Sequence, residues 1–312
     1  MSFVVIISSS FRTTTTSLYF STLAVLDIII LLFSFMDYID QIVRPMFITG
    51  AGCLLFFVFY TAIHFNVMTL VAMTTERYIV IRFPLRSRLL ITKRRTAQCI
   101  LAIGSFSILL NVLHIFTRKL EVYENTTCEF RNEGSRYFVT EIYVWIDSTV
   151  YSFFPILVLF VLNFLIICNV RRQQKQRGQL QVFGRPQRDV QKQLVVMSVL
   201  VSVGFMILTG PVALWLVIGR YSWKPDGQEK ATFNMVERLV SNLMYTNHAV
   251  NFIFYFVGGK RFRKEVSRIF LCKFVNITKA NSEPRSVVSV STVTCDTSSV
   301  VSVPTVTADT HL

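Results

Sequence analysis

The sequence predicts an all-α membrane protein, and two observations lead to this prediction. Of the 312 residues, 52% are hydrophobic and only 16% are charged, whereas charged residues make up about 25% of an average soluble domain. Runs of about 20 apolar residues recur with almost no Lys, Arg, Asp or Glu, and as a helix each run can cross ~30 Å of hydrocarbon. Because an unpaired strand edge cannot be satisfied in lipid, we expect every run to be helical.

Six such runs follow one another along the chain and are predicted to be six complete spans. In order, they are Leu18–Met36, Phe47–Met73, Thr96–Phe116, Ile142–Val170, Leu194–Ile218 and Val236–Val257. The residues before them hold a short apolar stretch and the segment SFRTTTTSLYF, predicted to be a loop. Without a basic region or a cleavage site, this start is expected to be neither a signal peptide nor a whole span.

Positive charge gathers in alternate loops. The formal net charge is +14, with seven basic residues in 77–95, seven in 171–192 and more in 260–279. Alternate loops share one side of a membrane, and basic loops favour the cytoplasmic side. This distribution argues against a nucleic-acid partner. It leaves two roles open: contact with anionic lipid, at about 1 kcal/mol per basic residue, or docking of an intracellular partner.

The opposite side has an exterior character. Residues 120–141 hold five Glu and the glycosylation sequon at Asn125, which is modified only on the lumenal side. A second sequon, at Asn276, is predicted to be cytosolic and unmodified. Cys53 and Cys128 both face the oxidising side and can pair, and closing a loop of ~76 residues would stabilise the fold by about 4 kcal/mol on the entropy model. The alternative is two unpaired thiols.

The carboxyl-terminal segment differs in composition from the rest of the chain. Residues 273–312 are rich in Ser, Thr and Val and are predicted to be a disordered cytoplasmic tail. Phosphorylation would make this tail a polyanionic ligand for a basic partner, and a passive tail is the alternative. Cys272, just after a basic amphipathic stretch, is a candidate for palmitoylation.

No enzyme motif is found in the sequence. It contains no CxxC, HExxH, phosphate-binding Gly loop or Gly-x-Ser-x-Gly elbow, and its four histidines lack metal-ligand spacing. We therefore expect neither catalysis nor a metal centre built from histidine or cysteine.

Asp27 lies in the middle of an apolar run. A charge at the bilayer centre costs roughly 2.5 to 3.5 kcal/mol on insertion scales, so it needs a partner from another helix. Amides occur at similar depth at Asn66, Asn247 and Asn251. This cluster is predicted to hold a sodium ion or ordered water, or to be a structural hydrogen-bond node.

Arg77 ends a long apolar run, between Glu76 and Tyr78 and before Pro84. Simple anchoring by snorkelling to water is one account. The other is a two-state element in which the acid holds the arginine until the bundle opens and a partner binds it. Pro155 and Pro211 are expected to kink two later helices, which would let the inner ends swing.

Several motifs together resemble the rhodopsin-like class of G protein-coupled receptors. In order, they are LAVLD with Asp27, Cys53 with Cys128, ERY followed by Pro84 and Leu85, the prolines of FFP and GP, and NFIFY ending at Tyr255. The resemblance covers residues 1–272. It implies a seven-transmembrane receptor bundle with the first helix largely missing, and a short amphipathic helix on the inner leaflet.

The resemblance also implies roles for individual residues. Arg77 would leave its cage on activation and contact a heterotrimeric G protein, with Glu76, Tyr78 and Tyr255 completing the switch. The phosphorylated tail would bind arrestin, and the protein would lie in the plasma membrane. A transporter or channel that uses Asp27 as an ion site is a competing interpretation, as is a truncated receptor fragment that does not signal.

Within the class, the segments FSILLNVLHIF and VSNLMYTNHAVNFIFYFVGGKRFRKEV are similar to invertebrate FMRFamide-type and myosuppressin-type neuropeptide receptors. This similarity implies an RFamide-like peptide ligand. Aromatic residues that are either core residues or the pocket for its phenylalanine-amide end are Phe56, Phe59 and Tyr60. Acids near the mouth that could bind its arginine are Glu141, Asp147 and Glu237.

Overall fold

In the computed structural model, the described residues are 15–43, 52–123, 125–178, 186–221, 226–227, 229–258 and 263. The chain divides into two units, residues 1–263 and 264–312, and every described residue belongs to the first unit. The predicted tail, Cys272 and nearly all of the predicted amphipathic helix therefore lie outside the described residues.

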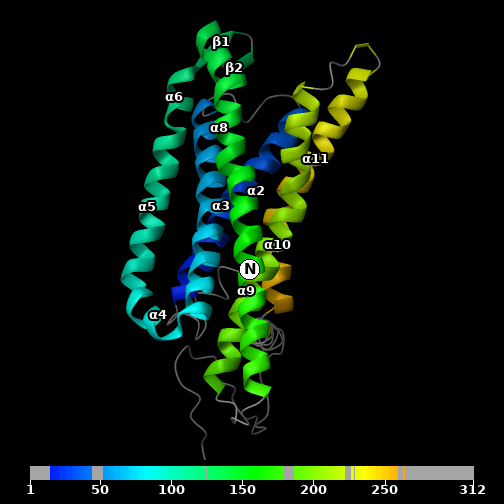
Figure 1. Ribbon diagram of the computed structural model, residues 1–312. Helices are drawn as coiled ribbons and strands as arrows, with labels where there is room; N and C mark the ends of the chain where they lie inside the picture. The colour runs from blue at the N-terminus through cyan, green and yellow to red at the C-terminus, as the bar shows by residue number, and fades with distance from the viewer. Residues whose placement is uncertain are drawn as a thin grey trace, which may run out of the picture. The chain divides into compact units, whose positions relative to one another are not determined.

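Long helices make up most of the first unit (Figure 1). They are α2 (Thr15–Val43), α3 (Gly52–Arg82), α5 (Lys93–Asn111) continued by α6 (Leu113–Thr117), α9 (Phe154–Gly178), α10 (Pro186–Tyr221) and α11 (Glu229–Gly258). Before α9 the chain is already helical, in the order α7 (Glu133–Tyr137), η2 (Phe138–Tyr143), α8 (Val144–Ser148) and η3 (Thr149–Phe153), where η2 and η3 are π-helical. Short α4 (Pro84–Leu90) connects α3 to α5.

The helices pack around α3. This helix contacts α2, α5, α9 and α10, while α11 packs on α10 and α2. Leu101 and Leu109 on α5 are 69% and 71% exposed, whereas Ser107 and Asn111 on the same helix are buried. A helix with its apolar side chains outward and its polar ones inward is suited to a lipid surround, in which apolar exposure carries no penalty.

Five of the described helical segments are long and apolar enough to cross a membrane. They are Thr15–Met36, Leu54–Arg82, Lys93–Thr117, Glu133–Lys175 and Gln193–Gly219. The sixth predicted span, Val236–Val257, forms most of α11 but is not among these five. The helix α11 is less apolar because its first half holds exposed charges such as Glu229, Lys230 and Glu237, and its second half holds the buried polar residues Asn247, His248 and Asn251.

The loop predicted for SFRTTTTSLYF is wrong from Thr15 onward. Residues 15–20 of the segment SFRTTTTSLYF form the first turns of α2. Thr has low intrinsic helix propensity, but here burial of Thr16, Tyr19 and Phe20 against other helices overrides it. Within residues 120–141, the structure has a hairpin and a helix that begins at Glu133, capped by the Asn132 side chain, which accepts a hydrogen bond from the Ser135 N–H at 2.7 Å.

The hairpin lies at one end of α5 and α4 lies at the other (Figure 1). Its strands, β1 (Arg118–Tyr123) and β2 (Asn125–Phe130), are antiparallel, with Arg118 opposite Phe130 and Leu120 opposite Cys128. Both strands contact α3. The hairpin therefore lies against the same end of α3 that carries Cys53.

The prolines act at helix ends and inside helices. Backbone geometry at Phe83 ends α3, and Pro84 occupies the start of α4, where its missing N–H costs no hydrogen bond. Pro211 lies inside α10. Pro155 lies in the first turn of α9, directly after the π-helical turns of η3.

Candidate functional site

Three groups of polar residues lie inside the bundle: an inner group around Arg77, a central group around Asp27 and an outer group around His64. The inner group lies toward the α4 end of α3, and the outer group toward the hairpin end. The first two groups hold buried charges, which must be compensated within the protein.

Arg77 is paired with its sequence neighbour. Its guanidinium Nη2 donates to Glu76 Oε1 at 2.7 Å and to Thr16 Oγ1 at 2.5 Å. Arg77 is only 2% exposed and Glu76 only 6%. A buried charge is tolerated only when it is paired and hydrogen-bonded. Arg77 and Glu76 can therefore both be buried because each compensates the charge of the other.

Hydroxyl groups from two other helices hold the Glu76 carboxylate. Thr15 of α2 donates to Oε1 at 2.6 Å, and Thr96 of α5 donates to Oε2 at 3.1 Å. We call Thr15, Thr16, Thr96 and the Glu76–Arg77 pair the arginine cage. The three threonines were missed from the sequence, because the Thr-rich segment was predicted to be a loop and Thr96 to be only the start of a span.

The other predicted switch residues are only partly visible. Tyr78 follows Arg77 on α3 and is half-buried. Tyr255 belongs to α11, but its side chain lies outside the described ones. Close to the cage, Gln173 of α9 donates to the backbone oxygen of Ile81 at 2.8 Å, so α9 is tied to the same end of α3.

The central group gathers three nitrogen donors on one carboxylate. Asp27 Oδ1 accepts from Asn66 Nδ2 at 2.9 Å and from His248 Nδ1 at 2.8 Å, and Oδ2 accepts from Asn251 Nδ2 at 2.8 Å. All four side chains are buried. Asp27 of α2 is therefore joined to α3 and to α11. Asn247 is buried as well, and its Oδ1 has no hydrogen-bond partner in the described part of the chain.

His248 was missed as a member of this group. It is adjacent to the predicted Asn247, and it lies three residues before Asn251, so it shares a helix face with that residue. This spacing was available in the sequence. It was overlooked because the histidines were considered only as metal ligands.

The outer group combines aromatic rings with one carboxylate. Asp147 Oδ1 lies 3.3 Å from His64 Nε2, and His64 Nδ1 donates to the backbone oxygen of Tyr60 at 2.9 Å. The Tyr60 ring stacks on His114 with centroids 4.6 Å apart. The Tyr143 hydroxyl donates to Asn111 Oδ1 at 2.5 Å. The His64 side chain is fully buried, whereas that of Asp147 is 24% exposed, so the carboxylate is the part of this pair that a ligand can reach.

The predicted pocket residues fall into two sets. Phe59 stacks on Phe33 of α2 at 4.2 Å and Phe56 meets the same ring edge-on, so both contribute to the α2–α3 packing. Tyr60 faces the outer group. Glu141 and Glu237 are exposed, in contrast to Asp147.

Arg118, at the base of the hairpin, also lies among aromatic rings. Its guanidinium carbon is 4.1 Å from the Phe56 centroid and 4.8 Å from the Phe130 centroid, which is cation–π geometry. Burial lowers the pKa of Arg118 from its usual value, because the charged form loses hydration. This clamp fixes β1 and β2 to α3.

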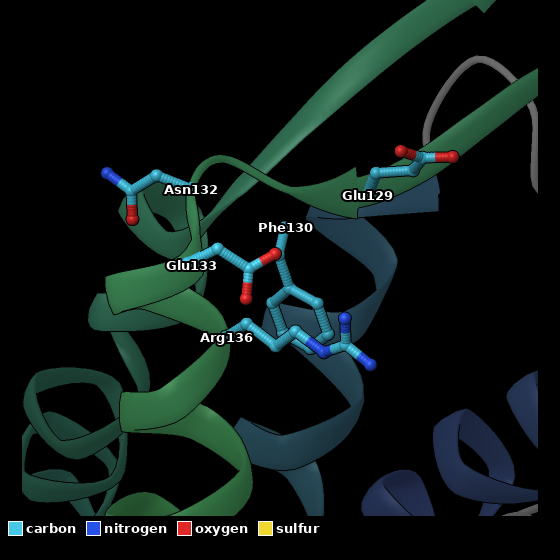
Figure 2. A pocket seen from close by; sticks show the side chains of 5 residues that line it. All are labelled: Glu129, Phe130, Asn132, Glu133 and Arg136. Atoms are coloured by element: carbon cyan, nitrogen blue, oxygen red, sulfur yellow. The ribbon is translucent and has the colours of Figure 1, made fainter.

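Outside the clamp, the hairpin base and α7 form a pocket of about 440 Å³. It is lined by Glu129, Phe130, Asn132, Glu133 and Arg136. Figure 2 shows the Glu133 and Arg136 side chains beside the Phe130 ring. The pocket was missed because the hairpin that shapes it was missed.

The predicted disulfide and glycan stay predictions. Cys53 lies in the first turn of α3 and Cys128 in β2, and these two elements are in contact. The side chains of Cys53, Cys128 and Asn125 lie outside the described ones.

Comparisons with known proteins agree with one another. Residues 2–255 match the family model described as 7 transmembrane receptor (rhodopsin family). Growth hormone secretagogue receptor type 1 of Homo sapiens is 30% identical over 268 residues, covering 82% of this chain and 72% of that receptor. Neuromedin-U receptor 2 of Homo sapiens is 23% identical over 275 residues, covering 83% and 65%. A probable G-protein coupled receptor of Caenorhabditis elegans is 27% identical over 217 residues, covering 66% and 49%.

Proposed function

Because the chain belongs to the rhodopsin family of seven-transmembrane receptors, and is thus a plasma-membrane receptor and not an enzyme, we propose that it transmits the binding of an RFamide-like peptide to a heterotrimeric G protein. The arginine cage carries this proposal. A guanidinium on the cytoplasmic rim, held by Glu76 and the Thr16 hydroxyl while two further threonine hydroxyls hold the Glu76 carboxylate, is a stable closed state with a defined way to open.

Opening the cage exchanges one set of contacts for another. In the closed state, hydrogen bonds to the charged Glu76–Arg77 pair join α2, α3 and α5. Each bond to a charged group contributes about 1.5–3 kcal/mol, so separation of the helices requires a compensating partner. A G protein surface that accepts the freed guanidinium is such a partner, and an agonist bound at the outer end shifts the equilibrium toward the open state.

Two similarities of the sequence support the peptide class. The relatives are receptors named for growth hormone secretagogues and for neuromedin-U, which favours a peptide hormone or neuropeptide. The sequence similarity to FMRFamide-type receptors favours a ligand that ends in Arg-Phe-amide. In the outer group, Asp147 is a partly exposed acid beside Tyr60 and His64, which suits a guanidinium followed by an aromatic ring.

A functional assay tests both halves of the proposal. Cells expressing the full chain and a panel of G proteins are treated with Phe-Met-Arg-Phe-amide and with the same peptide in which citrulline replaces arginine. We expect dose-dependent nucleotide exchange with the first peptide and at least a tenfold higher half-maximal concentration with the second. If no G protein in the panel responds to any RFamide peptide, and removal of the Glu76 charge leaves basal exchange unchanged, the signalling role is wrong.

The Asp147→Asn variant tests the proposed contact between Asp147 and the arginine of the peptide. Glu237→Gln, at an exposed acid, is the matched control. We expect Asp147→Asn to raise the half-maximal concentration of the arginine peptide about tenfold or more, since a charge pair is lost. The citrulline peptide should act equally on Asp147→Asn and on the unmodified chain. A loss that is the same for both peptides would show that Asp147 does not bind the peptide's arginine.

Phosphorylation of the Ser- and Thr-rich tail would let the receptor bind a second cytoplasmic protein in addition to the G protein. A polyanionic tail binds arrestin, while the basic loops face the anionic lipid of the inner leaflet.

A further inference from the structure

The carboxylate of Asp27 is surrounded by N–H groups. Its two oxygens accept three hydrogen bonds of 2.8–2.9 Å, from Asn66 on one neighbouring helix and from His248 and Asn251 on another. These donors use three of the roughly four acceptor positions of a carboxylate, so both positions on Oδ1 are already taken by N–H groups. The sequence suggested a sodium ion in this group. Such an ion would need oxygen atoms from the surrounding side chains.

Hard cations are held by oxygen atoms from carboxylates, carbonyls, amides and water. The two asparagines pass this test in one orientation, because turning either amide end for end would offer Oδ1 in place of Nδ2. His248 does not pass it in any orientation, because an imidazole ring carries no oxygen. Its Nδ1 lies 2.8 Å from Asp27 Oδ1, so an N–H group takes an acceptor position that a cation would need.

We propose that the His248 N–H occupies the place of the cation, so that the central group takes no sodium ion and instead fastens α2 directly to α11. Asn251 makes the second bond between the same two helices. These direct hydrogen bonds do not depend on the sodium concentration, whereas an ion-mediated contact would. This inference goes beyond the proposed function and does not depend on the identity of the peptide.

The unmodified protein provides the first test. The purified full-length chain is unfolded by heat in sodium chloride and in N-methylglucamine chloride at equal ionic strength. We expect the same Tm in both salts across physiological sodium concentrations. A higher Tm in sodium, saturating with concentration, would mean that the ion binds and that the proposal is wrong.

The second test removes the imidazole, which should create a sodium site beside Asp27. In His248→Ser, a hydroxyl oxygen replaces the ring, and Asn251 Oδ1, which has no hydrogen-bond partner among the described residues, is an additional oxygen ligand for a cation beside Asp27. We expect sodium to raise the Tm of this variant by roughly 2–4 °C, which corresponds to occupancy well above half. The double variant Asp27→Asn with His248→Ser is the matched control and should show no sodium effect.

A further variant, His248→Asn, serves in case His248→Ser does not fold. His248→Asn keeps an amide N–H for Asp27 and adds an oxygen, so it should fold where His248→Ser does not, and should also gain sodium dependence. If neither variant responds to sodium while both fold, the imidazole is not what excludes the ion. A peptide assay is not involved, so this outcome is separate from failure of the proposed receptor function.

Discussion

Among single residues, the Glu76–Arg77 pair makes the most direct prediction. Replacing Glu76 by Gln keeps a hydrogen-bonding side chain of the same size but removes the charge that holds the guanidinium. Loss of a charged hydrogen bond costs the closed state about 1.5–3 kcal/mol. We expect Glu76→Gln to raise agonist-independent nucleotide exchange about tenfold or more, measured in membranes at matched receptor levels. Unchanged basal exchange would show that the pair does not control opening.

Thr96 allows a finer test, because Thr75 offers a matched control. The Thr96 hydroxyl donates to Glu76, whereas that of Thr75 donates to the backbone oxygen of Val71 in its own helix at 2.8 Å. We expect Thr96→Val to raise basal exchange by a smaller factor than Glu76→Gln, because one bond to the carboxylate is lost and the charge remains. Thr75→Val should leave basal exchange unaltered. If Thr96→Val and Thr75→Val changed basal exchange equally, the bond from the Thr96 hydroxyl to Glu76 would not be what controls opening.

The sequence revealed part of each polar group, including Asn66 and Asn251, which bind Asp27 from two other helices. Glu76 and Arg77 are neighbours in the chain and Asp27 is conspicuous in an apolar run, so pattern alone identified them. Their partners Thr96 and His248 come from other helices, and nothing local distinguishes a threonine that meets a carboxylate from one that bonds its own backbone. A hydrogen-bond partner across helices depends on helix rotation, which the sequence pattern does not fix.

At the scale of elements, the membrane-buried centres of the helices were predictable and their ends were not. Apolar runs measure the part of a helix that lies in hydrocarbon, whereas α3 continues past Met73 to Arg82 and the helix before α9 begins at Glu133. The hairpin was missed for a similar reason. Its strands are short and polar, and they are held by pairing with each other and by the Arg118 clamp on α3, which are contacts distant in sequence.

Close contact between α10 and α11 leads to a third prediction. A Cβ added at Gly204 would lie 2.3 Å from Cε2 of Phe254, whereas one added at Gly210 of the same helix would meet nothing within 4 Å. We expect Gly204→Ala to lower the Tm, since either the ring or the helix must move. Gly210→Ala should leave it unchanged or raise it slightly, because Ala favours helix. Equal Tm values for the two variants would contradict this packing.

At the scale of the whole molecule, charge and helix length together determine which end faces which compartment. The segment Lys93–Thr117 is 25 residues long, or about 37 Å as a helix, and separates the exposed basic residues Arg82, Arg86 and Arg94 from the hairpin. The apolar runs and the alternating basic loops predict that the end of the bundle that carries α4 faces the cytoplasm. The reason is that the bilayer acts on composition alone and requires no knowledge of tertiary contacts.

The two sequons test this orientation within one molecule. Asn125 lies in the hairpin, on the predicted outer side, and Asn276 lies in the predicted cytoplasmic tail. Only lumenal sequons meet the glycosylation machinery. We therefore expect glycosidase treatment to increase the gel mobility of the chain without substitutions and of Asn276→Gln. The mobility of Asn125→Gln should not change. The opposite result would place the basic loops outside the cell. In that orientation the arginine cage would face away from any G protein, and the coupling mechanism could not operate.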